Sequence, residues 1–305
     1  MQYLEEFIQA KDGHDIPVRL WRPNRVERLL VIVHGMAEYC ERYAAFADWL
    51  TESNIAVVTL NLRGHGMDCN DDELGYFGEK DGWQLLLADI HATIEFAKQE
   101  LPNVPITLFG HSMGSFLAQN YIQQYPQQCE QLILGSTNRV NRSQISSALF
   151  LVSLLKRVKG SRAHSSLVEW LVFGRFNRRF KPNMSDNDWL SRDAEQVEAY
   201  TLDPFCGFPC SLSMWQDLFN GMLSIDIKNW PSECKLHLLS GSDDALGEFG
   251  QGITILANNI KKQALRLTTF RLYQEARHEL LNETNAMQVW QDIRDITLTG
   301  KLKEV

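Results

Sequence analysis

The chain has 305 residues, of which 44% are hydrophobic and 22% are charged, close to the usage of ordinary globular proteins. A chain of this length and composition can bury a full core, which excludes overall disorder and a small fold held together by disulfides. The formal net charge of -8 argues against a general nucleic-acid-binding protein.

The apolar runs are short, for example residues 148–152, whereas a membrane-spanning helix needs about 20 apolar residues. The first six residues have neither a basic start nor an apolar run, so no secretory signal is expected. The cysteines, at positions 40, 69, 129, 206, 210 and 234, have no framework spacing. Such scattered cysteines suit a reducing compartment, and we expect a cytoplasmic protein. Cys206 and Cys210 lack a second pair at zinc-site spacing, so no metal site is expected.

Short apolar runs alternate with longer amphipathic ones in the first half of the chain. Because continuous apolar strands that alternate with helices are typical of a parallel sheet covered on both faces, the pattern predicts an α/β fold. An antiparallel hairpin over 3–10 and 16–22 is expected to precede it, with Asp12-Gly13 at its turn. The predicted strands are 28–33, 55–60, 105–109 and 131–134, and the predicted helices cover 43–50, 86–97 and 113–124.

The alternation stops at about residue 138 and returns after residue 230. The intervening stretch contains apolar helical segments and an aromatic cluster but no clear strand. We therefore expect one α/β core, formed by residues 1–137 and 231–305, that is interrupted by a helical insertion over 138–230. In its second part the core is predicted to hold strands at 235–240 and 266–273 and helices at about 248–262 and 283–297.

A glycine-flanked serine directly follows the strand predicted at 105–109. The sequence Gly110-His111-Ser112-Met113-Gly114 leads straight into the helix predicted at 113–124. Between a strand and a helix, the pattern G-x-S-x-G marks a sharp turn that exposes the serine hydroxyl. Glycine on either side avoids a clash where the residues two before and two after the serine approach each other. We therefore expect Ser112 to be a nucleophile.

A serine hydroxyl needs a base to take its proton, and that base needs an anion to orient it. With this kind of turn the chain order is serine, acid, histidine. The strand predicted at 235–240 ends in Gly241-Ser242-Asp243-Asp244, and His278 follows the last predicted strand. Both lie just past strand carboxyl ends, where open parallel sheets place their sites. We expect His278 to be the base and either Asp243 or Asp244 to be the acid.

Acyl transfer also requires N–H donors for the oxyanion of the tetrahedral intermediate. One donor is expected at Met113, which follows the serine and begins a helix. The second is expected at Met36, in the loop after the strand predicted at 28–33, because Gly35 lets the chain turn beneath the substrate. His34 is expected to brace this loop and not to take part in catalysis.

Three motifs together resemble the monoglyceride lipase and lysophospholipase group of α/β hydrolases. They are the segment His34-Gly35-Met36-Ala37-Glu38-Tyr39 with Arg42-Tyr43, the loop Arg63-Gly64-His65-Gly66, and the serine turn at 110–114. The resemblance covers residues 1–137 and 232–300. It implies the α/β-hydrolase fold, a mostly parallel central sheet flanked by helices, with a helical cap inserted before the strand that carries the acid.

The resemblance also implies which residues carry the chemistry. In that family the acid ends a G-x-x-D element, which corresponds here to Asp244, and the histidine corresponds to His278. The two oxyanion donors correspond to the N–H groups of Met36 and Met113, and no cofactor is implied. The chain departs from the family pattern at Tyr39, where histidine is usual, and at Ser115, where a further glycine is common.

The function expected from these features is a serine hydrolase that cleaves a carboxylic ester of a lipid with one acyl chain, a lysophospholipid or a monoacylglycerol. An aminopeptidase on the same scaffold is an alternative, because carboxylates of the acidic stretch 186–198 could bind a substrate amino group. A catalytically silent binding protein is a third reading, although the serine, the acid and the histidine are all present.

Charge is unevenly distributed within the helical insertion. Residues 139–181 contain ten basic residues and one acid, whereas residues 182–230 contain eight acids and two basic residues. One interpretation is that the two halves neutralise each other. The other is that residues 139–181 make peripheral contact with an anionic membrane surface, which would place the protein at the inner membrane face.

Overall fold

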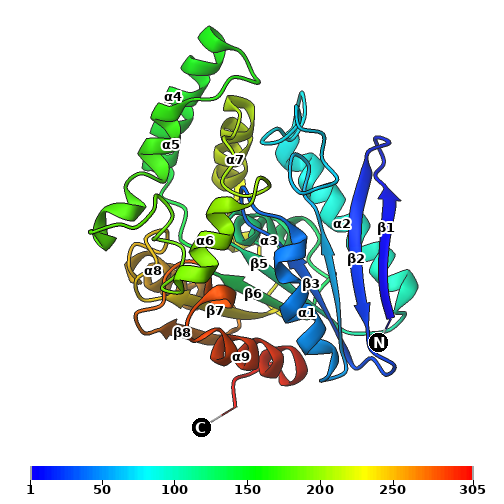
Figure 1. The fold of residues 1–305 in the computed structure, drawn as a ribbon. Coiled ribbons are helices and arrows are strands. Elements are labelled where there is room, and N and C mark those ends of the chain that lie inside the picture. The colour runs from blue at the N-terminus through cyan, green and yellow to red at the C-terminus, as the bar shows by residue number, and fades with distance from the viewer. Residues whose placement is uncertain (1, 304–305) are drawn as a thin grey trace.

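The computed structural model describes residues 2–303, and a single eight-stranded sheet forms its centre (Figure 1). The strand order is β1-β2-β4-β3-β5-β6-β7-β8. All neighbours from β4 to β8 run parallel, so the predicted mostly parallel sheet is confirmed. The strands are β1 (Gln2–Gln9), β2 (Asp15–Arg22), β3 (Arg28–Val33), β4 (Ile55–Leu60), β5 (Ile106–His111), β6 (Gln131–Gly135), β7 (Lys235–Gly241) and β8 (Leu267–Tyr273).

The first two strands form the predicted antiparallel hairpin, and β2 joins it to the parallel part through an antiparallel pairing with β4. The hairpin turns at Gly13, whose positive φ of 84° suits a glycine. Buried residues from successive positions of β3 face opposite sides of the sheet: Val31 and Val33 belong to one hydrophobic core and Leu30 and Ile32 to the other. The continuous apolar strands therefore reflect a sheet that is covered on both faces.

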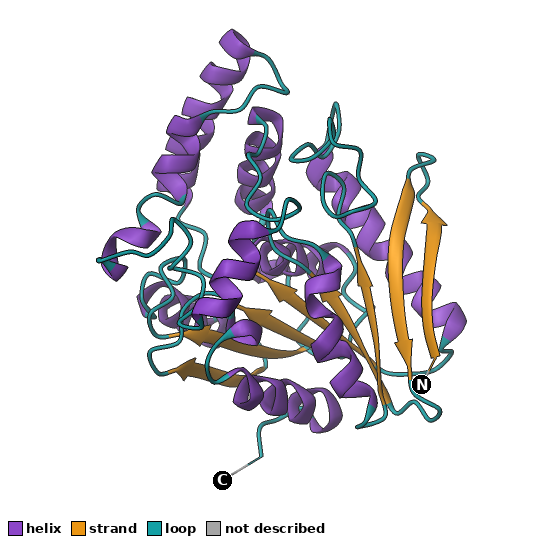
Figure 2. Cartoon of the chain, viewed as in Figure 1, coloured by secondary structure: helices purple, strands orange, loops and turns teal. Residues whose placement is uncertain are grey.

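Helices cover the two faces of the sheet (Figure 2). Apolar residues of α2 (Gly82–Glu100), α3 (Met113–Gln124) and α8 (Gln251–Lys262) belong to one core, and those of α1 (Ala44–Thr51) and α9 (Ala286–Thr299) to the other. The last helix begins later than the predicted residue 283. Glu283 lies in the preceding loop, where its buried carboxylate accepts hydrogen bonds from Arg192 and from the backbone N–H of Arg277.

Residues 138–230 contain helices and loops but no strand; the one β-type pairing is an isolated bridge between His164 and Ser211. In Figure 1 these helices lie above the edge of the sheet where the parallel strands end. Asn141 caps the first of them by accepting a hydrogen bond from the backbone N–H of Gln144. The helices are α4 (Arg142–Lys159), α5 (Ser166–Val172), α6 (Ala194–Leu202) and α7 (Leu212–Ser224), with 3-10 turns at Phe176–Phe180 and Ile227–Asn229.

Candidate active site

Ser112 lies in the sharp turn between β5 and α3, with φ 50° and ψ -117°. Few non-glycine residues adopt such a backbone conformation, and it is held here by close packing of the turn. A Cβ on Gly110 would lie 2.4 Å from the carbonyl oxygen of Gly114, and a Cβ on Gly114 would lie 2.1 Å from that of Val33. Both glycines of the motif are therefore required by steric exclusion, as the sequence pattern predicts.

Asp244 and His278 come from the loops that follow β7 and β8, and they meet at the same edge of the sheet. His278 Nδ1 lies 2.9 Å from Asp244 Oδ1, and both side chains are buried. The Asp244 carboxylate also accepts a hydrogen bond from the backbone N–H of Leu246 at 2.9 Å. Of the two adjacent aspartates that the sequence left open, Asp244 is thus the one that contacts the histidine.

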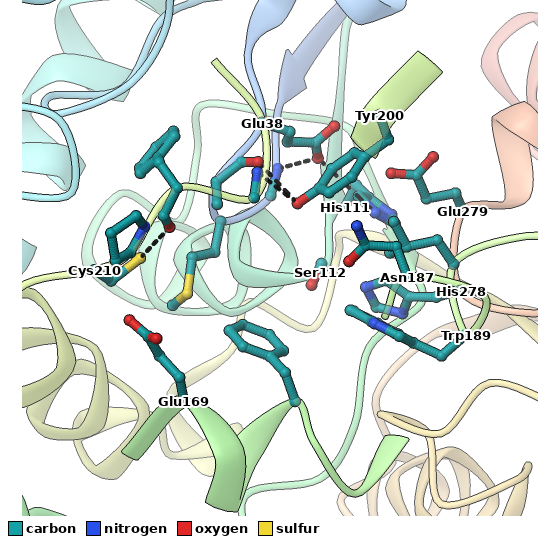
Figure 3. A pocket seen from close by; sticks show the side chains of 18 residues that line it. Glu38, His111, Ser112, Glu169, Asn187, Trp189, Tyr200, Cys210, His278 and Glu279 are labelled. Atoms are coloured by element: carbon teal, nitrogen blue, oxygen red, sulfur yellow. Dashed lines mark hydrogen bonds and ion pairs between the residues drawn. The ribbon is translucent and has the colours of Figure 1, made fainter. Parts of the chain in front are cut away.

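The environment of His278 acts on its pKa in two directions. Burial acts to lower the pKa, but the adjacent negative charge and hydrogen bond of Asp244 outweigh burial, so the pKa of His278 is raised. Because Nδ1 is bound to Asp244, Nε2 is the ring nitrogen that remains for a reacting group. Figure 3 shows Ser112 beside the His278 ring, and both line the same cavities.

The backbone N–H groups of Met36 and Met113 are free donors near this serine. Within residues 2–303, neither N–H donates a hydrogen bond. Met113 begins α3, where the first N–H groups of a helix have no intrahelical partner. Met36 lines both cavities that contain Ser112. Both residues thus carry an N–H that is unpaired in the described part of the chain and line a cavity that contains Ser112, and their role as oxyanion donors stays a prediction.

The loop that carries Met36 is braced by two buried histidines. His34 accepts a hydrogen bond from the N–H of Leu62 at 3.0 Å, and His65 accepts one from the N–H of Ala37 at 3.1 Å. Burial lowers the pKa of His34 to about 4 and that of His65 to about 3, so both are neutral acceptors at pH 7. The expected bracing role of His34 agrees with these contacts.

A buried ion network next to the site was not foreseen from the sequence. Arg42 binds both carboxylate oxygens of Glu279, at 2.6 and 2.7 Å, and also Glu38 at 2.9 Å. Glu38 in turn accepts hydrogen bonds from the N–H of Gly35 and from the hydroxyl of Tyr43. The network therefore joins the neighbour of His278 to the loop that carries Met36. Glu38 and Arg42 belong to a motif noted above, but nothing local in the sequence pairs them with Glu279.

Two cavities meet at the serine, and five residues line both of them: Met36, Ser112, Phe173, Trp189 and His278. The first, here called the apolar cavity, has a volume of about 480 Å³. Its walls are mainly aliphatic and aromatic side chains of α4, α5 and α7, among them Ile145, Ala148, Leu151, Leu171, Leu218 and Phe219.

The second, here called the acidic cavity, has a volume of about 410 Å³ and is the one drawn in Figure 3. Three glutamates line it, Glu38, Glu169 and Glu279, together with aromatic rings that include Trp189 and Phe208. Of the residues described, no lysine or arginine lines this cavity.

Two further kinds of feature, a group of metal ligands and a membrane-spanning helix, are absent from residues 2–303. In the part of the chain that is described, residues 2–303, no group of three or more His, Cys, Asp or Glu side chains is placed to hold a metal ion. Over the same range, no helix has both the length and the apolar composition needed to cross a bilayer.

The fold and the site define an α/β hydrolase. The sheet is mostly parallel, a strained serine follows β5, and an Asp–His pair follows β7 and β8. A sequence model of the family described as "Serine aminopeptidase, S33" matches residues 24–285. The chain belongs to this family.

Several relatives in sequence are named monoglyceride lipase or monoacylglycerol lipase. Mouse monoglyceride lipase is 24% identical over 287 residues, which span 92% of this chain and 85% of the relative. A monoacylglycerol lipase of Mycolicibacterium smegmatis is 25% identical over 300 residues, with 95% of both chains covered.

Solved structures share the fold. A thermostable carboxyl esterase from Bacillus coagulans superposes with a TM-score of 0.89 at 23% identity, over 97% of this chain and 98% of the esterase. A monoglyceride lipase of Saccharomyces cerevisiae superposes with a TM-score of 0.73 at 17% identity, over 99% of this chain and 96% of the lipase. These likenesses establish the α/β-hydrolase fold that the sequence motifs imply.

Proposed function

We propose that the protein is a serine hydrolase that cleaves the carboxylic ester of a lipid with one fatty acyl chain, a monoacylglycerol or a lysophospholipid. The observation that carries this proposal is the apolar cavity that opens directly at Ser112 and His278. Its aliphatic walls suit an unbranched acyl chain whose carbonyl carbon would lie at the serine. The relatives named monoglyceride lipase support the same substrate class.

The reaction would proceed through an acyl-enzyme. Ser112 Oγ attacks the acyl carbonyl carbon while its proton passes to Nε2 of His278, and Asp244 orients and stabilises the imidazolium. His278 then gives the proton to the departing alcohol oxygen as the ester C–O bond breaks. A water molecule, deprotonated by His278, then attacks the acyl group on Ser112. His278 returns this proton to Ser112 Oγ as the acyl C–O bond breaks, which releases the fatty acid and restores the enzyme.

The tetrahedral intermediates of both steps place a negative charge on the former carbonyl oxygen. We assign its stabilisation to the N–H groups of Met36 and Met113, which have no other hydrogen-bond acceptor in residues 2–303. In the same proposal, residues 1–137 and 231–305 form the catalytic core and residues 138–230 form a cap. The cap supplies most of the apolar cavity through α4, α5 and α7.

A panel of p-nitrophenyl esters of graded chain length tests the proposal. We expect kcat/KM to rise from acetate to medium-chain esters, by roughly tenfold for each two or three methylenes that the apolar cavity buries. Monolauroylglycerol and lysophosphatidylcholine belong in the same panel. A chain-length profile that falls from acetate onward, with no hydrolysis of either lipid, would overturn the assignment of the apolar cavity.

An aminopeptidase remains a second candidate, because the family description names that activity and a carboxylate without an ion-pair partner lines the acidic cavity. This carboxylate is Glu169, and it lies outside the acidic stretch 186–198 that the sequence suggested. Asp188 and Asp193 of that stretch instead accept hydrogen bonds from nearby backbone N–H groups. An amino-acid p-nitroanilide in the ester panel distinguishes the two activities.

We also propose that the cap makes peripheral contact with an anionic membrane surface. Phe150, Leu154 and Val158 recur every four residues along α4 and are 74%, 52% and 78% exposed. Exposed Arg157 and Lys159 lie beside them in the last turn. An apolar stripe flanked by basic residues is typical of helices that bind at a lipid interface.

The charge distribution of the cap supports this contact over internal neutralisation. Within residues 139–230, all of which are described, no ion pair joins a base of 139–181 to an acid of 182–230. Arg139 and Arg162 instead pair with Glu248 and Glu79, which lie outside the cap. Eight of the ten basic residues of 139–181 thus form no ion pair with a described residue, although Lys156 acts electrostatically on Asp217 of the second half.

Co-sedimentation with phosphatidylglycerol vesicles tests the membrane contact. Because each basic residue at an anionic surface contributes about 1 kcal/mol, the double variant Arg157→Glu, Lys159→Glu should bind at least roughly tenfold more weakly at low salt. The triple variant Phe150→Ser, Leu154→Ser, Val158→Ser should also lose binding.

As a control, Ile255→Ser removes an exposed apolar residue outside the cap, 41% exposed, and should leave vesicle binding unchanged. All these variants should hydrolyse a short soluble ester at the wild-type rate. Absence of wild-type binding at low salt, or equal binding by the double variant, would show that the cap does not contact such membranes.

A further inference from the structure

The acidic cavity lies on the side of Ser112 where the alcohol half of an ester would lie. If the acyl chain occupies the apolar cavity, the alcohol must extend from the same carbonyl into the other cavity that contains Ser112 and His278. His278 lines both cavities, which agrees with its task of protonating the departing alcohol oxygen. The chemistry of the acidic cavity therefore bears on which alcohol the enzyme accepts, and this inference rests on the function proposed above.

The charge of this cavity is not balanced by the protein. Glu38 and Glu279 share a single cation, Arg42, and Glu169 has no ion-pair partner in residues 2–303. Three carboxylates thus face one guanidinium. An alcohol that carries a negative charge would meet no basic side chain among the residues that line the cavity, so this cavity disfavours it.

Glu169 is the carboxylate that has room for a ligand. Its Oε1 is buried and accepts no hydrogen bond within residues 2–303, whereas buried polar atoms are nearly always paired. Burial raises the pKa of Glu169, and the backbone N–H of Cys210 and the charge of His164 offset this effect only in part. In Figure 3 the carboxylate projects from α5 into the cavity, across from Glu279, with Ser112 between them in this view.

Aromatic rings complete this part of the wall. Phe173, Trp189 and Phe208 line the cavity with Glu169. Trp189 stacks on Phe173 with ring centroids 5.8 Å apart. Aromatic faces combined with a carboxylate are the usual environment for an ammonium or quaternary ammonium group. The ring of Tyr200 is not counted here, because the guanidinium of Arg42 already lies over it at 4.9 Å.

We propose that the acidic cavity selects esters whose alcohol carries an ammonium or trimethylammonium group, with Glu169 as the counter-ion of that group. A neutral alcohol could donate a hydrogen bond to Glu169 but would leave its charge uncompensated. Among the esters with one fatty acyl chain proposed above, the cavity therefore favours those of an amino alcohol of the choline type over those with the neutral glycerol of a monoacylglycerol or the phosphate of a lysophospholipid. Cleavage follows the acyl-enzyme route given above and needs no further reactant.

Two esters that differ only in charge test this proposal: lauroylcholine and 3,3-dimethylbutyl laurate, in which a carbon atom replaces the nitrogen. We expect Glu169→Gln to lower kcat/KM for lauroylcholine roughly tenfold while the value for the neutral ester stays within about twofold. Comparing variant with wild type cancels the intrinsic difference in reactivity between the two esters. Glu198→Gln, an exposed glutamate of α6 that does not line the cavity, is the matched control and should change neither value.

Each other outcome has a defined meaning. If Glu169→Gln lowers kcat/KM equally for both esters, or for neither, the carboxylate does not distinguish a charged alcohol from a neutral one and the proposal is wrong. If the variant loses cleavage of leucine p-nitroanilide but not of lauroylcholine, Glu169 binds an amine on the acyl side, which also overturns it. Failure of the wild-type enzyme on both laurate esters would instead refute the function proposed above, so the two failures are distinguishable.

Discussion

Replacing Ser112 by alanine is expected to lower kcat on any ester substrate by roughly 10⁴- to 10⁶-fold, because the variant has no nucleophile to form the acyl-enzyme. The fold should persist. The Ser112 carbonyl, and not its side chain, accepts the hydrogen bonds from Ser115 that hold the turn, and alanine retains this carbonyl. Steady-state rates with p-nitrophenyl butyrate, together with far-UV circular dichroism and a thermal melt, measure both halves of this prediction.

A burst experiment makes the same prediction sharper. Rapid mixing of the wild-type enzyme with a p-nitrophenyl ester should release about one p-nitrophenol per active site before the steady state, provided that deacylation is slower than acylation. Ser112→Ala should show no burst, and Ser143→Ala, at an exposed position of α4, should behave as wild type. A Ser112→Ala variant that keeps more than about a tenth of the activity would remove Ser112 from the role of nucleophile.

The second large effect is expected at Asp244. Asn at this position can donate a hydrogen bond to Nδ1 and so favours the wrong tautomer of His278, which lowers kcat by about 10⁴-fold in enzymes with this arrangement. Asp243→Asn is the matched control, because Asp243 does not contact His278 and its side chain is partly exposed. We expect this control to keep activity within about threefold of wild type. The reverse ranking would move the orienting role to Asp243.

The pH profile adds a second measurement at the same position. His278 must be neutral to accept the serine proton, so activity falls as the pH drops through its pKa. Because Asp244 raises this pKa, the acid limb of kcat/KM should lie above the ordinary histidine value of about 6.5. In Asp244→Asn the limb should move to lower pH, since the raising charge is gone. An acid limb that does not move would mean that a group other than His278 controls it.

Some features of this protein could be predicted because they depend only on residues that are close together in the sequence. Gly110 and Gly114 flank Ser112 at a spacing that the sharp turn itself imposes, so strand, turn and helix were all predictable. His278 was identifiable since it follows the last strand, and the carboxyl ends of parallel strands share one edge of the sheet. The boundaries of α9 were less accurate, because contacts of Glu283 with distant residues keep it in a loop.

Other features depended on the tertiary structure. Asp243 and Asp244 are chemically identical neighbours, and only the path of the loop after β7 decides which of them contacts His278. The pairing of Arg42 with Glu279 joins residues 237 positions apart, which no local pattern encodes.

Charge patterns along the chain were the least informative about the site. The acidic stretch 186–198 suggested that its carboxylates could bind a substrate amino group. Two of them, Asp188 and Asp193, instead accept hydrogen bonds from backbone N–H groups of the cap itself. The carboxylate that lines the acidic cavity without an ion-pair partner, Glu169, is the lone acid of residues 139–181, the most basic part of the chain.

The sequence by itself thus determined the class of fold, the position of the serine and the histidine that follows the last strand, since each depends on backbone geometry over a few residues. The tertiary structure decided the partner of His278, the two cavities and the unbalanced charge of Glu169. These depend on which side chains meet across loops and helices that lie far apart in the chain, and burial then sets how strongly their charges act.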